Sequence, residues 1–285
     1  MSRIITLKND SLTVTVSTLG AEIQSVTGND GHEYLWCGDA SAWSGRAPIM
    51  FPICGALKDN QFVHNGKQYT LTKHGFARLN EFEVIEEDDT HATFRLSSNE
   101  ELKKCYPFDF HFDVSFLLSG NALLIEYRVE NTGNENMYFS FGAHEAYATP
   151  EGVESYSIVF DEKQTLDTND VGATLLYSQR RVLEDADTLP LHDGLFEQDA
   201  LVLLNTPFKS VKLVNKTGAH SVRVDFDGMD NMLIWKKLGA KFVCIEPWHG
   251  TPDFSDADGI LAHKAGITEL SQGKQFSRRH TITFG

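Results

Sequence analysis

The chain has 285 residues, 41% hydrophobic and 23% charged, as in an ordinary soluble globular protein. Its formal charge of −15 at pH 7 disfavours nucleic acids and anionic membranes as partners, because both require a basic binding face. The four cysteines form no C-x-x-C pair, so we expect no zinc knuckle or thioredoxin-type site and a reduced, cytoplasmic setting. We also expect neither a signal peptide nor an apolar run of the ~18 residues that span a bilayer.

Apolar and polar residues alternate along most of the chain, with the period of half-buried β-strands. The turn Ser119-Gly120-Asn121 joins two such segments and strongly indicates a hairpin. A second hairpin is expected around the acidic turn at 87–89. The expected strands are 12–17, 21–26, 83–86, 92–96, 110–118, 122–129, 137–141, 156–160, 210–214, 221–226, 232–236, 242–245 and 281–284.

Helical periodicity is scarce, and only residues 100–104 and 195–201 are expected to form short helical turns. Residues 161–200 are the least regular part, rich in Asp and Leu, and we interpret them as a long excursion from the main fold. We find no internal repeat and no linker. The sequence therefore predicts one domain, residues 1–285, with an all-β fold: a large antiparallel β-sandwich with few short helices.

The most informative segment is 243–250, where Glu246 ends an apolar run and is followed by Pro247 and Trp248. Burying a carboxylate at this point costs several kcal/mol unless the group is paired or used. Burial also raises its pKa toward the range of a useful general base. Trp248 offers a flat apolar face for a sugar ring. A solvent-exposed glutamate beside a structural tryptophan remains the alternative interpretation.

Two histidines lie close to glycines in the sequence. A nearby glycine has no side chain, so each imidazole ring has room to face a cavity. His74 precedes Gly75, and Arg78 lies four residues further on. His144 stands at a strand exit after Gly142, a position that suits a proton donor because the imidazole pKa lies near neutrality. A structural role for either histidine stays open.

Two further polar residues interrupt apolar segments. Arg46 precedes a proline-punctuated apolar run and is either a surface residue or a hydrogen-bond fork for hydroxyls or phosphate. Asp199 either caps a turn or accepts hydrogen bonds from ligand hydroxyls. Metalloprotease, phosphate-loop, dinucleotide and serine-hydrolase motifs are absent from the sequence, so we expect no metal or cofactor site and favour cofactor-free acid–base chemistry.

In this order, four motifs resemble the aldose 1-epimerase (galactose mutarotase-like) family, especially its shorter bacterial LacX-like branch: Arg46, His74-Gly75-Phe76-Ala77-Arg78, Gly142-Ala143-His144 and Glu246-Pro247-Trp248. The resemblance covers essentially the whole chain. It implies a large antiparallel supersandwich with an open cleft on one sheet. It further implies no cofactor or metal, with Glu246 as general base, His144 as general acid, His74 orienting the sugar, and Arg46 and Asp199 binding its hydroxyls.

One residue departs from the family pattern, because Glu145 follows His144 where proline or tyrosine is common. Its negative charge either raises the pKa of His144 or points away from the site.

The resemblance implies a mutarotase that interconverts the α and β anomers of an aldohexose such as glucose or galactose. One alternative is a hexose-6-phosphate mutarotase with Arg46 and Arg78 on the phosphate. Another is a non-catalytic carbohydrate-binding protein. A glycoside hydrolase would need two cooperating carboxylates, for which Asp199 and Glu246 are the only candidates. In each case the partner is a small-molecule sugar, and the sequence leaves monomer and homodimer equally open.

Overall fold

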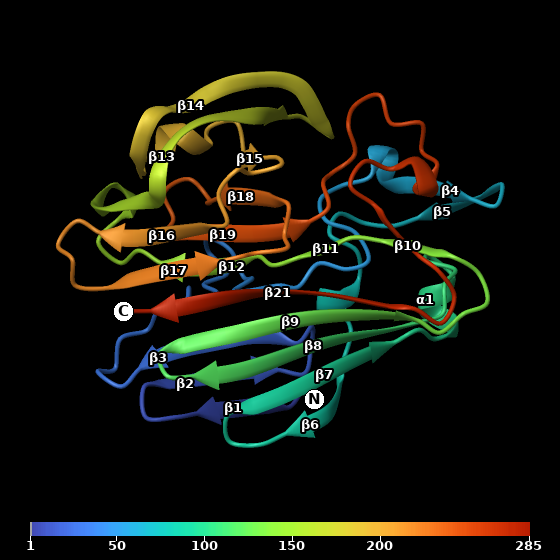
Figure 1. Ribbon diagram of the computed structural model, residues 1–285, viewed down its shortest axis with the longest axis horizontal. Helices are drawn as coiled ribbons and strands as arrows, with labels where there is room; N and C mark the ends of the chain where they lie inside the picture. The colour runs from blue at the N-terminus through green and yellow to red at the C-terminus, as the bar shows by residue number, and fades with distance from the viewer. Residues whose placement is uncertain (1) are drawn as a thin grey trace.

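Antiparallel strands are the main elements of the computed structural model, which describes residues 2–285 (Figure 1). The strands are β1 (Ile4–Lys8), β2 (Leu12–Ser17), β3 (Glu22–Gly28), β4 (Gln61–His64), β5 (Lys67–Thr70), β6 (Glu83–Glu87), β7 (His91–Ser97), β8 (Phe110–Ser119), β9 (Ala122–Asn131), β10 (Met137–Phe139), β11 (Phe141–Gly142), β12 (Glu145–Ala148), β13 (Tyr156–Val171), β14 (Leu175–Pro190), β15 (Leu201–Leu203), β16 (Ser210–Asn215), β17 (Ser221–Asp225), β18 (Asn231–Trp235), β19 (Phe242–His249), β20 (Thr268–Leu270) and β21 (Gln275–Phe284). The helical turns are η1 (Lys58–Asn60), η2 (Ala77–Leu79), α1 (Glu100–Lys103), η3 (Val153–Ser155), η4 (Asp193–Phe196) and η5 (Leu261–His263). None of these helices is long and apolar enough to cross a membrane.

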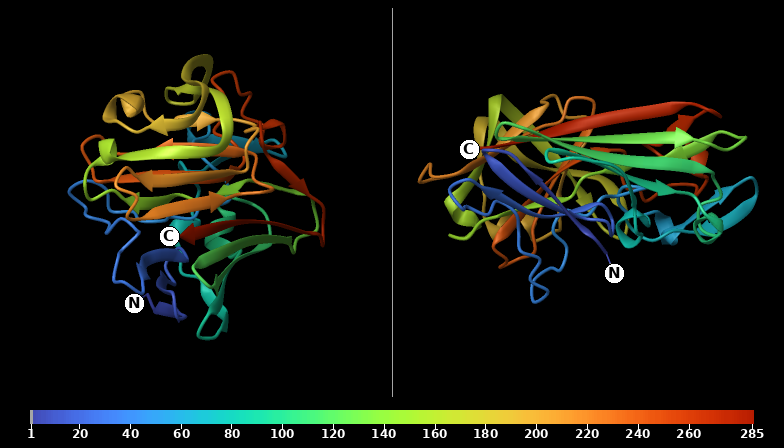
Figure 2. Two further views of the ribbon diagram at one scale, coloured as in Figure 1. Left: turned by 60° about the vertical axis from the view of Figure 1, so that its left-hand side comes forward. Right: turned by 90° about the horizontal axis from the view of Figure 1, so that it is seen from below.

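One 14-stranded sheet forms most of the fold, in the order β11-β19-β18-β15-β13-β16-β17-β21-β9-β8-β7-β6, with β12 also paired to β19 and β14 to β13. A three-stranded sheet, β1-β2-β3, lies alongside the β6–β9 part (Figures 1 and 2). A hydrogen bond from the Lys8 amide to the Asp89 carbonyl, 2.6 Å long, connects the two. The expected all-β antiparallel sandwich is confirmed.

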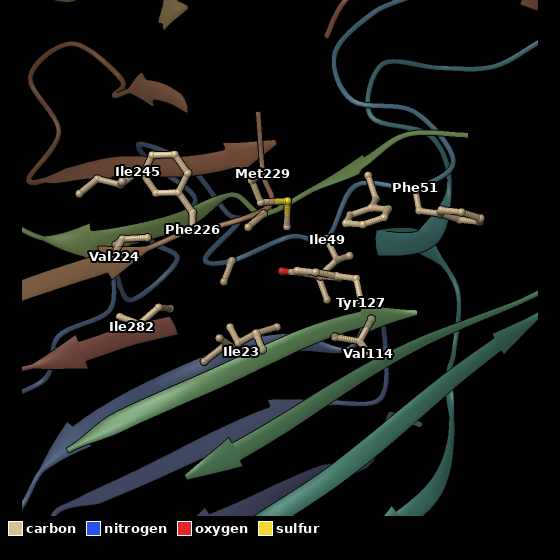
Figure 3. Packing of buried hydrophobic residues seen from close by; sticks show 14 of the residues in the cluster. Ile23, Ile49, Phe51, Val114, Tyr127, Val224, Phe226, Met229, Ile245 and Ile282 are labelled. Atoms are coloured by element: carbon tan, nitrogen blue, oxygen red, sulfur yellow. The ribbon is translucent and has the colours of Figure 1, made fainter. Parts of the chain in front are cut away.

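The core lies between the layers and is filled by side chains from strands that are distant in sequence (Figure 3). Burying one aliphatic side chain contributes roughly 1.5–3 kcal/mol relative to leaving it in water. Six of the labelled residues come from β3, β8, β9, β17, β19 and β21, and four lie between strands: Ile23, Val114, Tyr127, Val224, Ile245 and Ile282, and Ile49, Phe51, Phe226 and Met229, respectively.

Strand β19 is buried on both faces, which sets it apart from the outer strands. Val243 and Ile245 belong to the main core, whereas Phe242 and Cys244 pack in a separate small cluster on the other face. Successive side chains of a strand point to opposite faces, so Glu246 lies on the same face as Cys244. This second face is the one that carries the chemistry described below.

Several predicted elements are confirmed, and one interpretation is wrong. Both hairpins form, as β6–β7 and β8–β9, and the helical turn at 100–104 is α1. Residues 161–200, expected to be irregular, instead contain most of the long hairpin β13–β14. Register shifts interrupt the pairing of this hairpin at four places. Each shift changes which face a side chain occupies, so the period-two pattern that identifies a strand is lost.

Candidate active site

A cavity of about 410 Å³ opens on the outward face of β18 and β19. Its wall brings together six of the seven side chains that the sequence singled out: His74, Arg78, His144, Asp199, Glu246 and Trp248. Residues 172–174, the turn of the β13–β14 hairpin, form part of the wall. This turn is held in place because Leu175 donates to the Asp253 carbonyl at 2.9 Å and accepts from the Ser255 amide at 3.0 Å.

Strand register places His144 opposite Glu246. β11 pairs with β19 through Gly142 and Trp248, and β12 pairs with it through Glu145 and Ile245. The two pairings share one register, and continuing it across the gap sets His144 against Glu246. Directly opposed side chains in an antiparallel ladder are close neighbours. The His144 Nε2 to Glu246 Oε2 distance is 3.5 Å, and the exposed fractions of the side chains are 11% and 2%.

Burial favours the neutral form of each member of this pair. It lowers the pKa of His144 to about 3 and raises the pKa of Glu246 well above its usual 4.5. The positive charge of Lys73 opposes the second effect and favours the Glu246 carboxylate. A buried carboxyl and a buried imidazole at this distance can share a single proton, which is what a reversible proton-transfer pair needs.

Aromatic rings hold the His144 imidazole. The Trp43 ring stacks on it with centroids 5.1 Å apart, and the Trp235 ring meets it edge-on at 5.7 Å. Both tryptophans are half-buried and line the cavity. Sequence analysis missed them, because nothing in the local pattern around either residue distinguishes a cavity wall from ordinary core.

Trp248, which the sequence suggested as a sugar platform, is 2% exposed. Its indole N–H donates to the Ala143 carbonyl at 3.2 Å, and its ring packs edge-on against His74 at 5.7 Å. Trp248 therefore supports the cavity wall through its contacts with Ala143 and His74. The half-buried rings of Trp43 and Trp235 offer more surface to a ligand.

His74 is fixed in a neutral tautomer. The Gly55 amide donates to its Nδ1 at 3.2 Å, so the ring proton of the neutral form lies on Nε2. Burial and the neighbouring His144 lower the pKa of His74 well below 6.5. Its backbone has a φ of 70°, and the next residue must be glycine because a Cβ at Gly75 would collide with the Phe51 carbonyl. His74 is thus built as a hydrogen-bond donor.

Charged groups surround the cavity mouth. Arg78 donates to the Lys73 carbonyl at 3.1 Å, while its Nε is buried without a partner among residues 2–285. Lys73 and Asp199 also line the cavity and are exposed. Asp199 adopts a φ of 83°, which is unfavourable for a non-glycine residue. Left-handed residues in a cavity wall are typical of functional sites.

Two sequence-predicted groups lie elsewhere. Arg46 does not line the cavity, and its Nη1 donates to the Gln24 carbonyl at 2.6 Å. Glu145 points to the opposite face of β12 from His144 and pairs with the buried His280 at 3.2 Å. Of the two options left open for Glu145, the structure therefore supports the one in which it points away from the site.

One group of potential metal ligands lies at the base of the site. A nitrogen of His144, the Cys244 sulfur and a Glu246 carboxylate oxygen all lie within 4.8 Å of one another. Cys244 and Glu246 are separated by one residue on β19, whereas His144 lies far earlier in the chain. No metal-binding sequence motif could therefore predict this group.

Comparison with known proteins identifies the family of the chain. Residues 3–261 match the family described as Aldose 1-epimerase. The chain is 33% identical to the plasmid-borne Protein LacX of Lactococcus lactis subsp. lactis, over 98% of each chain. A galactose mutarotase related enzyme from Lactobacillus acidophilus has a TM-score of 0.94 at 33% identity, covering 99% of this chain and 97% of its own. A galactose mutarotase-like protein from Lactobacillus casei has a TM-score of 0.91 at 27% identity, covering 99% and 100%. The chain therefore belongs to the aldose 1-epimerase family and is an isomerase of the mutarotase type.

Proposed function

We propose that this protein interconverts the α and β anomers of an aldohexose, with Glu246 as general base and His144 as general acid. The observation that carries this proposal is the opposed placement of His144, just before β12, and Glu246 on β19, at 3.5 Å in the wall of a cavity with room for a sugar. Each positioned acid or base typically contributes about 10²–10⁴-fold to the rate.

Before the reaction starts, the His144–Glu246 pair must hold one proton, which lies on His144. Glu246 takes the proton of the C1 hydroxyl while His144 gives a proton to the ring oxygen, and the C1–O5 bond breaks to leave the open aldehyde. Rotation about the C1–C2 bond presents the other carbonyl face, and closure reverses both transfers. A C1 hydroxyl donating to Glu246, together with the charge of Lys73, favours the carboxylate–imidazolium form over the neutral pair.

The remaining cavity residues orient the sugar. The Nε2 proton of His74 suits a sugar oxygen, and Arg78 and Asp199 suit ring hydroxyls. Trp43 or Trp235 provides the apolar surface for the C–H face of the ring. Holding the open aldehyde between these groups favours re-closure over escape.

A sugar phosphate is the second candidate substrate. The observation that favours it is the presence of two cations, Lys73 and Arg78, at the cavity mouth. Arg46, the residue first expected to assist Arg78, lies outside the cavity lining, so Lys73 takes its place in this version. Two such cations suit a phosphate dianion.

Polarimetry on freshly dissolved α-glucose, α-galactose and α-glucose 6-phosphate tests both versions. We expect acceleration by the native protein and its loss in Glu246→Gln and His144→Asn, while Glu162→Gln, which alters an exposed glutamate on β13, keeps the native rate. A preference of more than about 10-fold for the phosphate would favour the second substrate. Sugar binding without acceleration of any of the three would indicate a binding protein instead.

We also propose a reduced, cytoplasmic setting. All four cysteines are free, and two of them, Cys54 and Cys244, are buried. Free thiols of this kind are usual in reducing compartments. Separating cell extracts and detecting the protein by antibody would test the location.

A further inference from the structure

A buried thiol that the proposed reaction does not use lies beside its acid–base pair. Cys244 is fully buried, two residues before Glu246 on the same face of β19. Its cross-strand partner on β12 is Ala146. Cys244 does not itself line the cavity, but His144 and Glu246 do. The Cys244 sulfur, a His144 nitrogen and a Glu246 oxygen lie within 4.8 Å of one another.

The spacing of these atoms suits a tetrahedral metal ion. Zn²⁺ binds sulfur at about 2.3 Å, imidazole nitrogen at about 2.0–2.1 Å and carboxylate oxygen at about 2.0–2.2 Å, which sets ligand atoms about 3.4–3.6 Å apart in a tetrahedron. His144 and Glu246 already have one such separation, 3.5 Å. The Cys244 sulfur lies within 4.8 Å of both atoms, and a change in its side-chain torsion angle would have to bring it to the tetrahedral spacing.

The donor set selects the kind of metal. Sulfur, nitrogen and oxygen together suit Zn²⁺ or Cd²⁺, whereas Mg²⁺ and Ca²⁺ require oxygen ligands. A thiolate and a carboxylate would offset both charges of the ion. Lys73 and Arg78 also line the cavity and oppose a cation, which lowers the affinity.

We propose that His144, Cys244 and Glu246 bind a thiophilic divalent cation, Zn²⁺ in the first instance, and that the bound ion reversibly inhibits the enzyme. Three protein ligands leave a fourth position facing the cavity for water. Binding releases two protons to solvent, the thiol proton and the proton shared by His144 and Glu246, and uses a lone pair of His144, with no oxidation or reduction. The bound ion occupies both groups of the proton-transfer pair, so mutarotation stops. The inhibition rests on the proposed function, whereas the metal binding does not.

The test uses Cd²⁺ and Co²⁺ as spectroscopic probes on the chelator-treated full chain carrying Cys37→Ala, which removes the exposed thiol. We expect a thiolate-to-metal absorption band that saturates at one equivalent, and its loss on adding Cys244→Ala. Cys54→Ala, which removes the other buried thiol, serves as the matched control and should keep the band. Cys244→Ser provides a second variant if the alanine variant folds poorly.

Activity gives the second readout. Without metal, Cys244→Ala should retain mutarotation within about 3-fold of the native rate, while the Zn²⁺ concentration for half inhibition rises at least 10-fold. A chelator should restore the activity of the inhibited native protein. The proposed metal site would be rejected if the Cys37→Ala protein gave no band, or if the band remained after Cys244→Ala was added. If the band behaves as expected but no sugar turns over, the metal site stands and the proposed function fails.

Discussion

At the residue scale, the cavity concentrates features that cost stability. Glu246 and His144 are buried with pKa values displaced toward their neutral forms, and His74 and Asp199 have left-handed backbones. Such costs persist where the surrounding structure enforces them and function uses them. Local sequence patterns suggested four of these groups, because glycines and an interrupted apolar run mark the turns that hold them. No comparable feature of the sequence distinguishes Trp43 and Trp235 from ordinary core residues.

Replacing Glu246 should separate activity from stability. Glu246→Gln removes a buried carboxylate while keeping the shape, so we expect mutarotation to fall by at least about 10². The melting temperature should rise, because burial raises the pKa of Glu246 and this costs stability at neutral pH, a cost that an uncharged amide does not carry. Polarimetry and thermal unfolding measure the two effects. A lower melting temperature with unchanged activity would show that Glu246 is a structural residue.

Removing the ring that stacks on His144 should slow the reaction without unfolding the protein. In Trp43→Leu the imidazole loses its stacking partner at 5.1 Å, and we expect kcat to fall about 10-fold through poorer orientation. Trp36→Leu is the matched control, since Trp36 packs against Phe242. Equal losses in both variants would indicate a general packing effect.

At the element scale, the site depends on the pairing of β12 with β19. The sequence predicted a strand at 242–245, which is part of β19, but none at 145–148, where β12 lies. Period-two alternation also gives no information about which strands pair. His144 and Glu246 are brought together only by that register. On the opposite face of β12, Glu145 reaches across the core to His280 on β21. This buried pair connects β12, near one end of the 14-stranded sheet, with β21 in the middle of the sheet.

Breaking the Glu145–His280 pair should therefore affect both stability and catalysis. Glu145→Ala leaves His280 buried without its acceptor, and we expect a loss of about 3–5 kcal/mol. The kcat should fall more than KM changes, because the neighbouring His144 loses its fixed position. Glu145→Gln, which can still accept a hydrogen bond, should recover much of the activity. Denaturant unfolding and steady-state kinetics distinguish this result from an effect on stability alone.

At the scale of the whole molecule, alternation and turn chemistry were enough to predict an antiparallel sandwich. They failed at β13–β14, where four register shifts disrupt the alternation along each strand. They also could not predict the order of the 14-stranded sheet, since its neighbours are set by long-range packing. The resemblance to a family supplied the chemistry that pattern alone left open.

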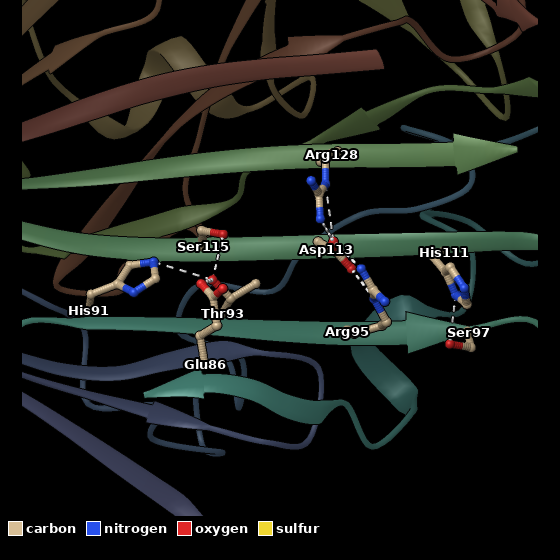
Figure 4. A network of polar contacts seen from close by, with 9 residues as sticks. All are labelled: Glu86, His91, Thr93, Arg95, Ser97, His111, Asp113, Ser115 and Arg128. Atoms are coloured by element: carbon tan, nitrogen blue, oxygen red, sulfur yellow. Dashed lines mark hydrogen bonds and ion pairs between the residues drawn. The ribbon is translucent and has the colours of Figure 1, made fainter. Parts of the chain in front are cut away.

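A polar network far from the cavity should control stability without affecting activity (Figure 4). Asp113 on β8 is buried between Arg95 at 2.7 Å and Arg128 at 2.6 Å. Burial alone would raise the pKa of Asp113, but hydrogen bonds from both arginines outweigh it and lower the pKa below 3.8. A lowered folded-state pKa gives stability that is present above pH 3.8 and lost as pH falls through the folded-state value.

We expect Asp113→Asn to cost about 2–3 kcal/mol at pH 7, less than a fully buried pair because the arginines are partly exposed. The difference from the native protein should shrink as the pH falls below 3.8, while mutarotation per folded molecule stays unchanged. Urea unfolding at several pH values provides the measurement. A difference that is constant with pH would exclude an ionised Asp113 as its source.

We propose that His144 and Glu246 open and close a sugar ring, and one measurement tests this directly. Exchange NMR on glucose labelled with ¹³C at C1 measures the rate at which the α and β anomers interconvert through the open aldehyde. The measurement is made at equilibrium, so the concentrations of the two anomers do not change. We expect exchange cross-peaks with the native protein, and their reduction to the uncatalysed level with folded Glu246→Gln and His144→Asn. Cross-peaks of native intensity in both variants would show that these two residues do not catalyse the reaction.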